Sequence, residues 1–414
     1  MLVGMENEKV QLSEAEVTEA IGELKMKKAM DPGGLCAEQL RNLPNKGIQL
    51  LTATLRRTLE ERIVPSQIKE AYKIMIPKPG KDSRVMDNWR GITITTIILK
   101  ILEIICRKKS LEEAIDSELA DLQMGFTYGR SPAMASLMIT EAAAEAKLAK
   151  TPLIATSLDA KKAFDVVNHS KLKAKLYSTT ISPTWWAIID NLYMDSSECI
   201  RWKGIDSRKY QVFQGVKQGS VISPYLYKLY INNLLKNLAR NNLGMSIGSQ
   251  YVGSPACADD VILLTQDLNQ VQPLLTSASE YAALHDYELH PKKTVITSIL
   301  KPKTSIKIPE ENEWYLNGAK VTQEDSFTHL GLTWKSNSLT PDVDANIQKA
   351  RRACYSLLKI GLHGTNGIDP PAALKIIQTY VIPRLLQGLE ATVLNREDLQ
   401  KLDKFHKKML RQIQ

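Results

Sequence analysis

The chain has 414 residues, of which 43% are hydrophobic and 24% charged, as in a folded globular protein and unlike a disordered or collagen-like chain. Lysine and arginine outnumber aspartate and glutamate by 54 to 45, which favours an acidic partner such as nucleic acid over a neutral metabolite. The five cysteines lack CxxC spacing, which disfavours a zinc site or a disulfide framework and favours a reducing compartment.

The N-terminal region predicts two helices. Ser13 and the acids that follow it form a capping box before a helix over 13–28, and a turn at Asp31-Pro32-Gly33-Gly34 precedes a helix over 37–62. No signal pattern opens the chain, and the apolar stretch 92–105 is too short to span a bilayer. We therefore expect an intracellular protein, nuclear or cytoplasmic, that is neither secreted nor bound to a membrane.

Residues 71–81 predict a strand that ends in a basic, proline-stiffened turn containing Lys78. The segment 88–94 predicts the returning strand, and 97–111 a helix with a basic end. Backbone amides and lysines of such a turn suit a phosphate, although an ordinary solvated hairpin has the same composition. Next, Arg130 ends a glycine-punctuated loop before a helix over 133–150, where it either binds a phosphate or pairs with a surface acid.

Asp159 ends the β-prone run 153–158 and opens into a turn. We interpret the nearby Asp165 as the N-cap of the helix through Leu172 rather than as a site residue. A helix with Trp185-Trp186, expected in the core, and the glycine-rich stretch 212–222 follow, and glycines let a backbone approach a flat ligand closely. Ser223-Pro224 then starts a long amphipathic helix to about Leu238.

Asp259 and Asp260 stand between Ala256-Cys257-Ala258 and the apolar run 261–264, a pattern that predicts a hairpin tip entering a buried strand. An isolated pair of this kind is typical of a solvated turn. The Asp159 strand has the same pattern, however, and strands far apart in sequence can be neighbours in one sheet. Three carboxylates at one sheet end would hold two Mg²⁺ ions about 4 Å apart, as for in-line phosphoryl transfer.

The C-terminal part changes character. Lys292 and Lys293 precede another β-rich segment, and 327–332 predict a short strand and a turn. Long helices rich in lysine and arginine are predicted over 346–362, 371–380 and 396–413. Basic helices can track a phosphate backbone, but rows of charge are also typical of solvated faces.

In this order the motifs resemble those of the reverse transcriptases of non-LTR (LINE-type) retrotransposons, from about Lys28 to Gln414. Residues 158–165 are similar to xDxxKAFD, residues 215–224 to GVxQGSxxSP, and Cys257-Ala258-Asp259-Asp260 to [YF]ADD. Weaker similarities to fingers, QxGFRxGRS, LNxxK and FxYLG motifs lie at 76–81, 88–92, 123–131, 289–293 and 327–331.

The resemblance implies an α+β fold of the right-hand polymerase class, with fingers, a palm with an antiparallel sheet, and a helical thumb. It divides the chain into an N-terminal helical extension (1–56), fingers and palm (57–334) and a thumb (340–414) that we expect to be truncated. The implied activity is RNA-directed DNA polymerase, extending a DNA primer 3′-OH with dNTPs on an RNA template. We expect no endonuclease domain in this chain.

The resemblance also assigns roles to residues. Asp159, Asp259 and Asp260, with the Ala160 carbonyl, would hold two Mg²⁺ ions, Mn²⁺ being an alternative, and Lys293 would protonate pyrophosphate. The residues implied to bind nucleotides are Lys78 and Arg90 at the triphosphate, Phe164 beneath the sugar where it excludes a 2′-hydroxyl, and Gln218 and Gly219 in the template-nucleotide pocket.

Several positions depart from the family pattern. Cys257 replaces an aromatic residue and Thr127 an arginine, while His290 and His329 replace asparagine and tyrosine, and the turn at 31–34 differs from G-x-D-G. These departures favour a catalytically inactive, nucleic-acid-binding relic, whereas the three intact acids favour an enzyme. An intron-type maturase, which uses the same palm to bind and help fold RNA, is a further alternative.

Overall fold

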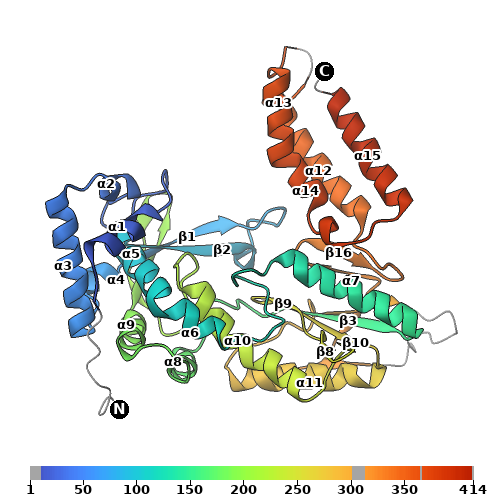
Figure 1. Cartoon of the computed structure of the whole chain (residues 1–414), viewed down its shortest axis with the longest axis horizontal. Helices are drawn as coiled ribbons and strands as arrows, with labels where there is room; N and C mark the ends of the chain where they lie inside the picture. The colour runs from blue at the N-terminus through green and yellow to red at the C-terminus, as the bar shows by residue number, and fades with distance from the viewer. Residues whose placement is uncertain (1–10, 301–312, 364–365, 413–414) are drawn as a thin grey trace. The chain divides into compact units, whose positions relative to one another are not determined.

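The computed structural model describes residues 11–300, 313–363 and 366–412. The chain divides into two compact units, each with helices and a five-stranded sheet (Figure 1). Unit 1 comprises Met1–Leu119, Lys162–Asn233 and Leu284–Tyr287, and unit 2 comprises Ala120–Lys161, Leu234–Ala283 and Glu288–Gln414. The predicted division at 1–56, 57–334 and 340–414, part of which lies outside the described residues, stays a prediction.

The sheet of unit 1 has the order β2-β1-β4-β5, with β6 also paired to β4. β1 pairs antiparallel with β2 and parallel with β4, so the two strands predicted around the basic turn form a hairpin. The strands of this sheet are β1 (Ala71–Pro77), β2 (Trp89–Thr95), β4 (Ser197–Trp202), β5 (Ile205–Asp206) and β6 (Tyr210–Gln211).

The helices of unit 1 follow the predicted pattern with two exceptions. The helix predicted over 13–28 ends at Gly22, since glycine is a poor helix former, and the structure has two helices over 37–62. Pro44 has no N–H to continue a helix and instead stands in extended backbone as the N-cap of the second one. The predicted capping box between Ser13 and Glu16 is present. The helices are α1 (Glu14–Gly22), α2 (Ala37–Arg41), α3 (Asn45–Glu61), α4 (Ser66–Lys69), η1 (Met86–Asn88), α5 (Ile97–Cys106), the π-helix η2 (Arg107–Leu111), α6 (Glu112–Asp116), α8 (His169–Tyr177) and α9 (Pro183–Tyr193).

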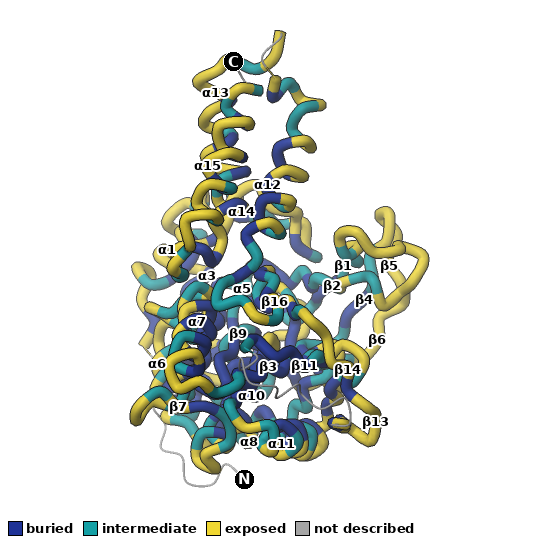
Figure 2. The backbone as a smooth tube through the Cα atoms, turned by 90° about the vertical axis from the view of Figure 1, so that its right-hand side faces the viewer, coloured by how far each residue is buried: buried dark blue, intermediate teal, exposed yellow. Residues whose placement is uncertain are grey.

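The sheet of unit 2 has the order β14-β11-β3-β10-β9, and its central strand β3 is antiparallel to both neighbours. Figure 2 shows β3 and β11 as buried strands. Every residue from Val261 to Thr265 in β10 is buried, as expected for a strand covered on both faces. The strands are β3 (Leu153–Leu158), β9 (Ala256–Cys257), β10 (Asp260–Thr265), β11 (Val295–Leu300) and β14 (Thr322–Gln323).

Helix α7 packs on this sheet. Its residues Ile139, Ala143 and Ala146 join Ile262 and Leu264 of β10 in one buried cluster. Short hairpins complete the β-structure of unit 2: β7 (Ser246–Ile247) with β8 (Gln250–Tyr251), β12 (Tyr315–Leu316) with β13 (Ala319–Lys320), and β15 (Ser326–His329) with β16 (Leu332–Lys335).

The last part of unit 2 is helical, as predicted, and has its own buried cluster, which includes Ile347, Ile377 and Phe405. The helices of unit 2 are α7 (Pro132–Ala149), η3 (Leu268–Gln270), α11 (Val271–Leu284), α12 (Val343–Leu358), α13 (Pro370–Ile376), the π-helix η4 (Ile377–Val381), α14 (Ile382–Leu386), η5 (Leu389–Ala391) and α15 (Arg396–Arg411), and α10 (Ser223–Arg240) runs from unit 1 into unit 2. The predicted end of the last helix at 413 lies outside the described residues.

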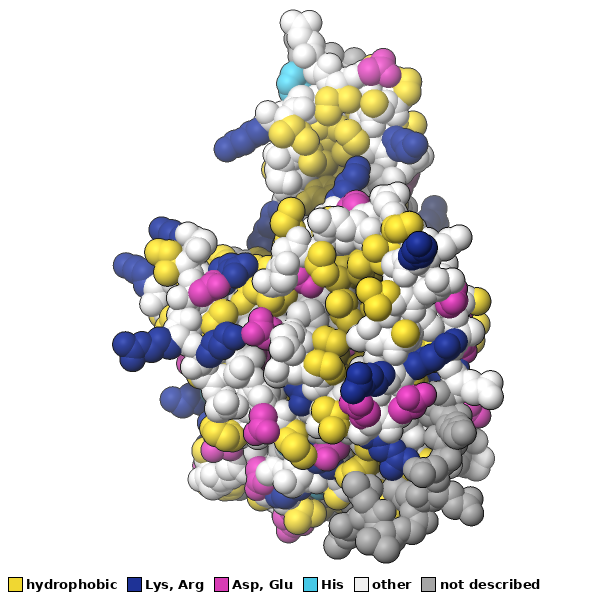
Figure 3. Space-filling model, turned by 90° about the vertical axis from the view of Figure 1, so that its left-hand side faces the viewer, with side chains coloured by type: hydrophobic (Ala, Val, Ile, Leu, Met, Phe, Trp, Pro, Cys, Tyr) yellow, Lys and Arg dark blue, Asp and Glu magenta, His cyan; other side chains and the backbone are white. Residues whose placement is uncertain are grey.

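Charged side chains are mixed on the surface. On the face in Figure 3, lysine and arginine are scattered among aspartate, glutamate and apolar side chains rather than gathered in one patch. In unit 1 two basic residues of η2 are paired with acids of α1 and its C-cap: Lys109 with Glu16 at 2.6 Å and Arg107 with the cap residue Glu23 at 2.7 Å. Among the described residues, no helix combines the length and apolar character needed to cross a membrane.

Candidate active site

The paired acids lie at the tip of a hairpin, as predicted. β9 and β10 pair antiparallel, with Cys257 opposite Asp260. Ala258 turns the chain in the left-handed region, with φ +58°, and is 3% exposed, whereas Asp259 and Asp260 are exposed. The tip therefore turns two carboxylates toward solvent at the point where a buried strand begins.

A third carboxylate lies at the same sheet end. β3 and β10 pair antiparallel with Leu158 opposite Val261, so the next positions outward are Asp159 and Asp260. Facing side chains in such a pair are neighbours across the sheet. Strand register thus brings Asp159 beside the hairpin tip, as the sequence predicted.

The pKa of Asp260 reflects its desolvation and the negative charges near it. Desolvation of its carboxyl group and, after that, the charges of Asp259 and Asp159 raise the pKa of Asp260 to about 6. A carboxyl group that resists ionisation next to two others is a good site for a compensating cation. One cation is already close, because Lys293 Nζ lies 3.4 Å from Asp159 Oδ2.

The segment that carries Lys293 is tied to the turn after β3. The His290 amide donates to the Asp159 carbonyl at 2.8 Å, and Ala160 forms a bridge with Leu289. Two lysines in a flexible loop would be weak evidence for a site, but here the backbone holds Lys293 at the sheet end. Ala160, predicted as a carbonyl ligand, lies in the same bridged stretch.

The chemistry of these donors fits a divalent metal ion. Within residues 11–300, 313–363 and 366–412, no three side chains of histidine, cysteine, aspartate or glutamate are grouped closely enough to hold a metal ion as they stand. Asp159, Asp259 and Asp260 nonetheless supply hard carboxylate oxygens at one sheet end, where desolvation and the neighbouring negative charges raise the pKa of Asp260. These three side chains are the residues that would hold a divalent ion at this sheet end.

The predicted triphosphate residues Lys78 and Arg90 lie in unit 1, at the β1–β2 hairpin. Lys78 Nζ donates to the Asp87 carbonyl at 2.9 Å, and the Lys78 amide donates to the Asn88 carbonyl at 2.7 Å. Arg90 is exposed on β2, opposite Ile76. The hairpin thus presents both cations, with Lys78 partly engaged in closing its own turn.

The predicted template-pocket residues Gln218 and Gly219 contact the backbone of β2. The Thr93 amide donates to the Gln218 carbonyl at 2.7 Å. Gly219 has φ +120°, and a Cβ there would lie 2.5 Å from the Thr93 carbonyl oxygen, so only glycine fits. Gln218 Oε1 is buried without a hydrogen-bond partner among the described residues, which leaves an acceptor for a ligand.

Phe164 has a fixed ring. It stacks on Tyr227 with centroids 4.7 Å apart and planes at 12°. The prediction for the neighbouring Asp165 was wrong: Asn168 is the N-cap of α8 and accepts from the Lys171 amide, while Asp165 Oδ1 lies 3.7 Å from Lys73 Nζ. The cap residue was misassigned because α8 begins only at His169, three residues later than a cap at Asp165 requires.

Sequence reasoning missed a buried acid under the glycine-rich loop. Glu103 is 3% exposed and accepts from Ser220 Oγ at 2.8 Å and from the Val221 amide at 2.9 Å. Burial raises the pKa of Glu103, and these two hydrogen bonds oppose that rise. A lone glutamate inside the most apolar stretch of the chain was the signal that could have identified it.

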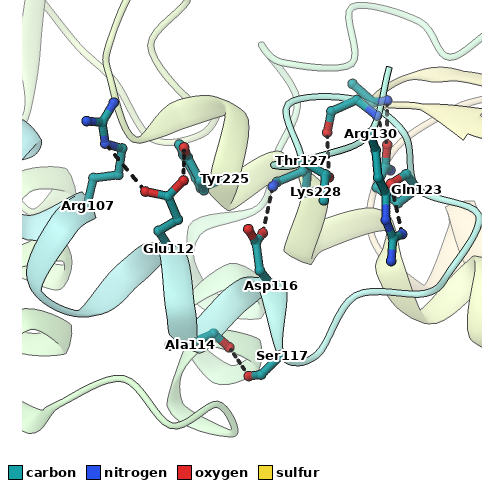
Figure 4. Close-up of polar contacts among 12 residues, drawn as sticks. Arg107, Glu112, Ala114, Asp116, Ser117, Gln123, Thr127, Arg130, Tyr225 and Lys228 are labelled. Atoms are coloured by element: carbon teal, nitrogen blue, oxygen red, sulfur yellow. Dashed lines mark hydrogen bonds and ion pairs between the residues drawn. The ribbon is translucent and has the colours of Figure 1, made fainter. Parts of the chain in front are cut away.

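A buried ion pair in unit 1 was missed as well. The Lys228 side chain is fully buried, and its Nζ lies 2.9 Å from Asp116 Oδ1 (Figure 4). On the same helix α10, Tyr225 donates to Glu112 at 3.1 Å. These contacts join α6 to α10 and need no ligand to explain them.

The fold and these sites define a class of protein. Residues 76–334 match the family model described as "Reverse transcriptase (RNA-dependent DNA polymerase)", and because this match spans more than half of the chain, the protein belongs to that family. The family match confirms the predicted right-hand polymerase fold, and the observed mixture of helices and sheets agrees with it.

The similar proteins come from non-LTR retrotransposons, as the motifs predicted. The chain is 27% identical over 350 residues to a "Retrovirus-related Pol polyprotein from type-1 retrotransposable element R2" of Popillia japonica, covering 82% of this chain and 47% of that protein. It is 24% identical over 409 residues to the "RNA-directed DNA polymerase from mobile element jockey" of Drosophila funebris, covering 96% and 43%. The chain thus spans less than half the length of these relatives.

Among solved structures, apo telomerase from Candida Tropicalis truncated from its C-terminal domain aligns with a TM-score of 0.46 and 14% identity. The alignment covers 68% of this chain and 56% of that one.

Proposed function

We propose that this chain is an RNA-directed DNA polymerase that extends a DNA primer with dNTPs on an RNA template. The primer 3′-oxygen attacks the α-phosphate of the incoming nucleotide and pyrophosphate leaves. The observation that carries the proposal is the meeting of Asp159 with Asp259 and Asp260 at one sheet end, in a chain of the reverse transcriptase family.

In this proposal Asp159, Asp259 and Asp260 hold two Mg²⁺ ions, with the Ala160 carbonyl as a further ligand and Mn²⁺ as an alternative metal. Bound ions of this kind supply charge neutralisation to the triphosphate and to the attacking oxygen. The three carboxylates would bind and orient the ions, and the positive charge of the ions would offset the desolvation and negative charge that raise the pKa of Asp260.

Lys293 is proposed to donate a proton to the leaving pyrophosphate. Its Nζ lies 3.4 Å from Asp159 Oδ2, within reach of the phosphates that the carboxylates would bind through metal. The residues proposed to bind nucleotides are Lys78 and Arg90 for the triphosphate, Phe164 for the sugar, and Gln218 and Gly219 for the template base.

The role of Phe164 follows from its stacking. Stacking on Tyr227 favours one orientation of the Phe164 ring, and in that orientation the ring would clash with a 2′-hydroxyl placed over it. The Gln218 acceptor that lacks a partner among the described residues supports its contact with a nucleotide.

A second candidate function is nucleic-acid binding without turnover. Cys257 supports it, because the family has an aromatic residue at this position, opposite Asp260 in the hairpin. In that case the acids persist but the primer end is not held for attack.

Primer extension on poly(rA) with oligo(dT), dTTP and Mg²⁺ tests the two candidates on the full chain. We expect extension by the wild type and its loss in Asp259→Asn. Glu141→Gln, which removes one exposed carboxylate from α7, is the matched control and retains activity. Extension that survives Asp259→Asn contradicts the metal assignment, and extension by neither protein supports the inactive alternative.

A further inference from the structure

The hairpin that carries the acids has a tip that needs support. Ala258 immediately precedes Asp259 and adopts φ +58°, a conformation that residues with a side chain rarely take. It is also buried, so its N–H must find an acceptor within the protein. Whatever satisfies this N–H also sets the direction in which Asp259 and Asp260 leave the turn.

The acceptor is the side chain of Gln123. Gln123 is 0% exposed, and its Oε1 accepts from the Ala258 amide at 2.9 Å and from the Gly125 amide at 3.0 Å. A single oxygen thus joins the backbone at Gly125 to the hairpin tip, although Ala258 is 135 residues from Gln123 in the sequence. Gln123 Nε2 is buried without a hydrogen-bond partner in the part of the chain that the structure describes, so the contacts of this amide are made through its oxygen.

The backbone around Gln123 lies directly against the hairpin. The Met124 amide donates to the Ala256 carbonyl at 2.7 Å, and the Ala256 amide donates to the Leu122 carbonyl at 2.9 Å. At Gly125 a Cβ would lie 2.6 Å from the Ala258 nitrogen, so no side chain fits there. The hairpin tip is therefore enclosed by this segment as well as hydrogen-bonded to it.

Arg130 is hydrogen-bonded to the segment that carries Gln123, and Figure 4 shows the two residues side by side. Its Nη1 donates to the carbonyls of Ala120, Asp121 and Gln123 at 2.9, 2.8 and 3.2 Å, and its Nη2 lies 3.7 Å from Asp121 Oδ1. Of the two interpretations that the sequence left open, the structure supports pairing within the protein rather than phosphate binding. Arg130 closes the loop from which Gln123 reaches the tip.

We propose that Gln123 is a positioning residue that fixes the Asp259-Asp260 tip through the Ala258 N–H, so that the carboxylates bind metal in the geometry that polymerisation needs. This inference rests on the proposed function. A neutral amide suits the task, because it accepts two N–H groups without adding a fourth negative charge beside Asp159, Asp259 and Asp260.

The test compares Gln123→Met with Gln270→Met. Methionine matches glutamine in length but has no strong acceptor. Gln270 is the matched control because its Oε1 also accepts a backbone N–H, that of Gly244 at 2.9 Å, and contacts Thr265 at the opposite end of β10. Each full-length protein is assayed for kcat, KM for dTTP, the Mg²⁺ concentration at half-maximal rate, and the Mg²⁺-induced rise in melting temperature without nucleotide.

We expect kcat to fall about 100-fold in Gln123→Met, the loss that misplacement by about 1 Å produces, with KM for dTTP unchanged. The half-maximal Mg²⁺ concentration should rise and the Mg²⁺-induced thermal shift should shrink. Gln270→Met should lose stability but keep the wild-type Mg²⁺ response. Gln123→Glu keeps an accepting oxygen at the same length but adds a negative charge beside Asp159, Asp259 and Asp260, so its kcat should lie between those of Gln123→Met and the wild type.

The inference is overturned if Gln123→Met folds and keeps the wild-type kcat and Mg²⁺ response. It is also overturned if Gln270→Met loses as much kcat and Mg²⁺ response as Gln123→Met does. If Gln123→Met has no cooperative melting transition, Gln123→Asn replaces it. We again expect a lower kcat and a weaker Mg²⁺ response, and wild-type values would again overturn the inference. A wild-type chain that neither extends primers nor responds to Mg²⁺ overturns the proposed function itself. If the wild type is active and Gln123→Met has the same kcat and Mg²⁺ response as the wild type, only the positioning role of Gln123 is overturned.

Discussion

In unit 2 the hairpin tip before Asp259 is held by the neutral amide of Gln123, whereas in unit 1 the loop after Gln218 is held by the carboxylate of Glu103. Both acceptors are buried, and both bind a backbone N–H across more than a hundred residues of sequence. The same mechanical task is therefore performed by different chemical groups.

The difference follows from the charges nearby. At the tip in unit 2 three carboxylates lie close together, and desolvation, followed by the charges of Asp259 and Asp159, raises the pKa of Asp260 to about 6. Around Glu103 the neighbouring charges are instead those of Lys217 and Lys100, which favour its ionised form against the burial that disfavours it. A buried acceptor can thus be a carboxylate where cations are near and is better neutral where anions gather.

The largest effect on stability is expected from Glu103→Leu. It leaves the Ser220 hydroxyl and the Val221 N–H without their acceptor, at a cost of about 4 kcal/mol of unfolding free energy. Chemical denaturation measures this loss. Glu70→Leu is the control in the same unit: it breaks an exposed pair with Lys209 and should change stability by less than about 1 kcal/mol. Equal effects of the two substitutions would contradict the role of the buried carboxylate.

An intermediate effect that depends on pH is expected from the histidines of the two units. His329 in unit 2 is 3% exposed, and burial lowers its pKa from 6.5 to about 4. The unfolded chain therefore takes up a proton first, so stability is lost as the pH falls from 6.5 to 4, by about 3 kcal/mol.

His329→Phe should remove this acid sensitivity while leaving stability near pH 8 within about 1 kcal/mol of the wild type, as measured by denaturation at several pH values. His169 in unit 1 makes the contrasting case, because its ring nitrogen lies 2.8 Å from the Gly215 carbonyl, a bond that opposes the fall in its pKa. An unchanged pH profile in His329→Phe would show that His329 is not the responsible group.

The smallest expected effect is a shift of a few degrees in melting temperature for Asp260→Asn without metal. The pKa of Asp260 is raised from 3.8 to about 6, so its ionisation disfavours the folded state, and stability is lost as the pH rises through this interval. Removing the charge should raise the melting temperature at pH 7.5 but not at pH 3.5. A lower melting temperature at pH 7.5 would mean that desolvation and the neighbouring carboxylates do not disfavour the ionised form of Asp260 in the folded protein.

The local elements could be predicted from the sequence because their signals are local. The capping box at Ser13, the acidic hairpin at Asp259 and the strand ending at Asp159 all form where spacing and turn chemistry indicated. The errors were also local: Pro44 divides a helix that apolar spacing alone continued, and Asn168 rather than Asp165 caps α8.

By itself, the sequence determined to which family the chain belongs and offered candidate residues for binding metal and phosphate, since the order of motifs and the alternation of strands and turns can be read along the chain. Only the tertiary structure decided which buried groups hold those residues in place. Gln123 meets the Ala258 amide, and Glu103 the Val221 amide, through folding alone, because a hydrogen bond between segments more than a hundred residues apart leaves no periodic trace in either segment.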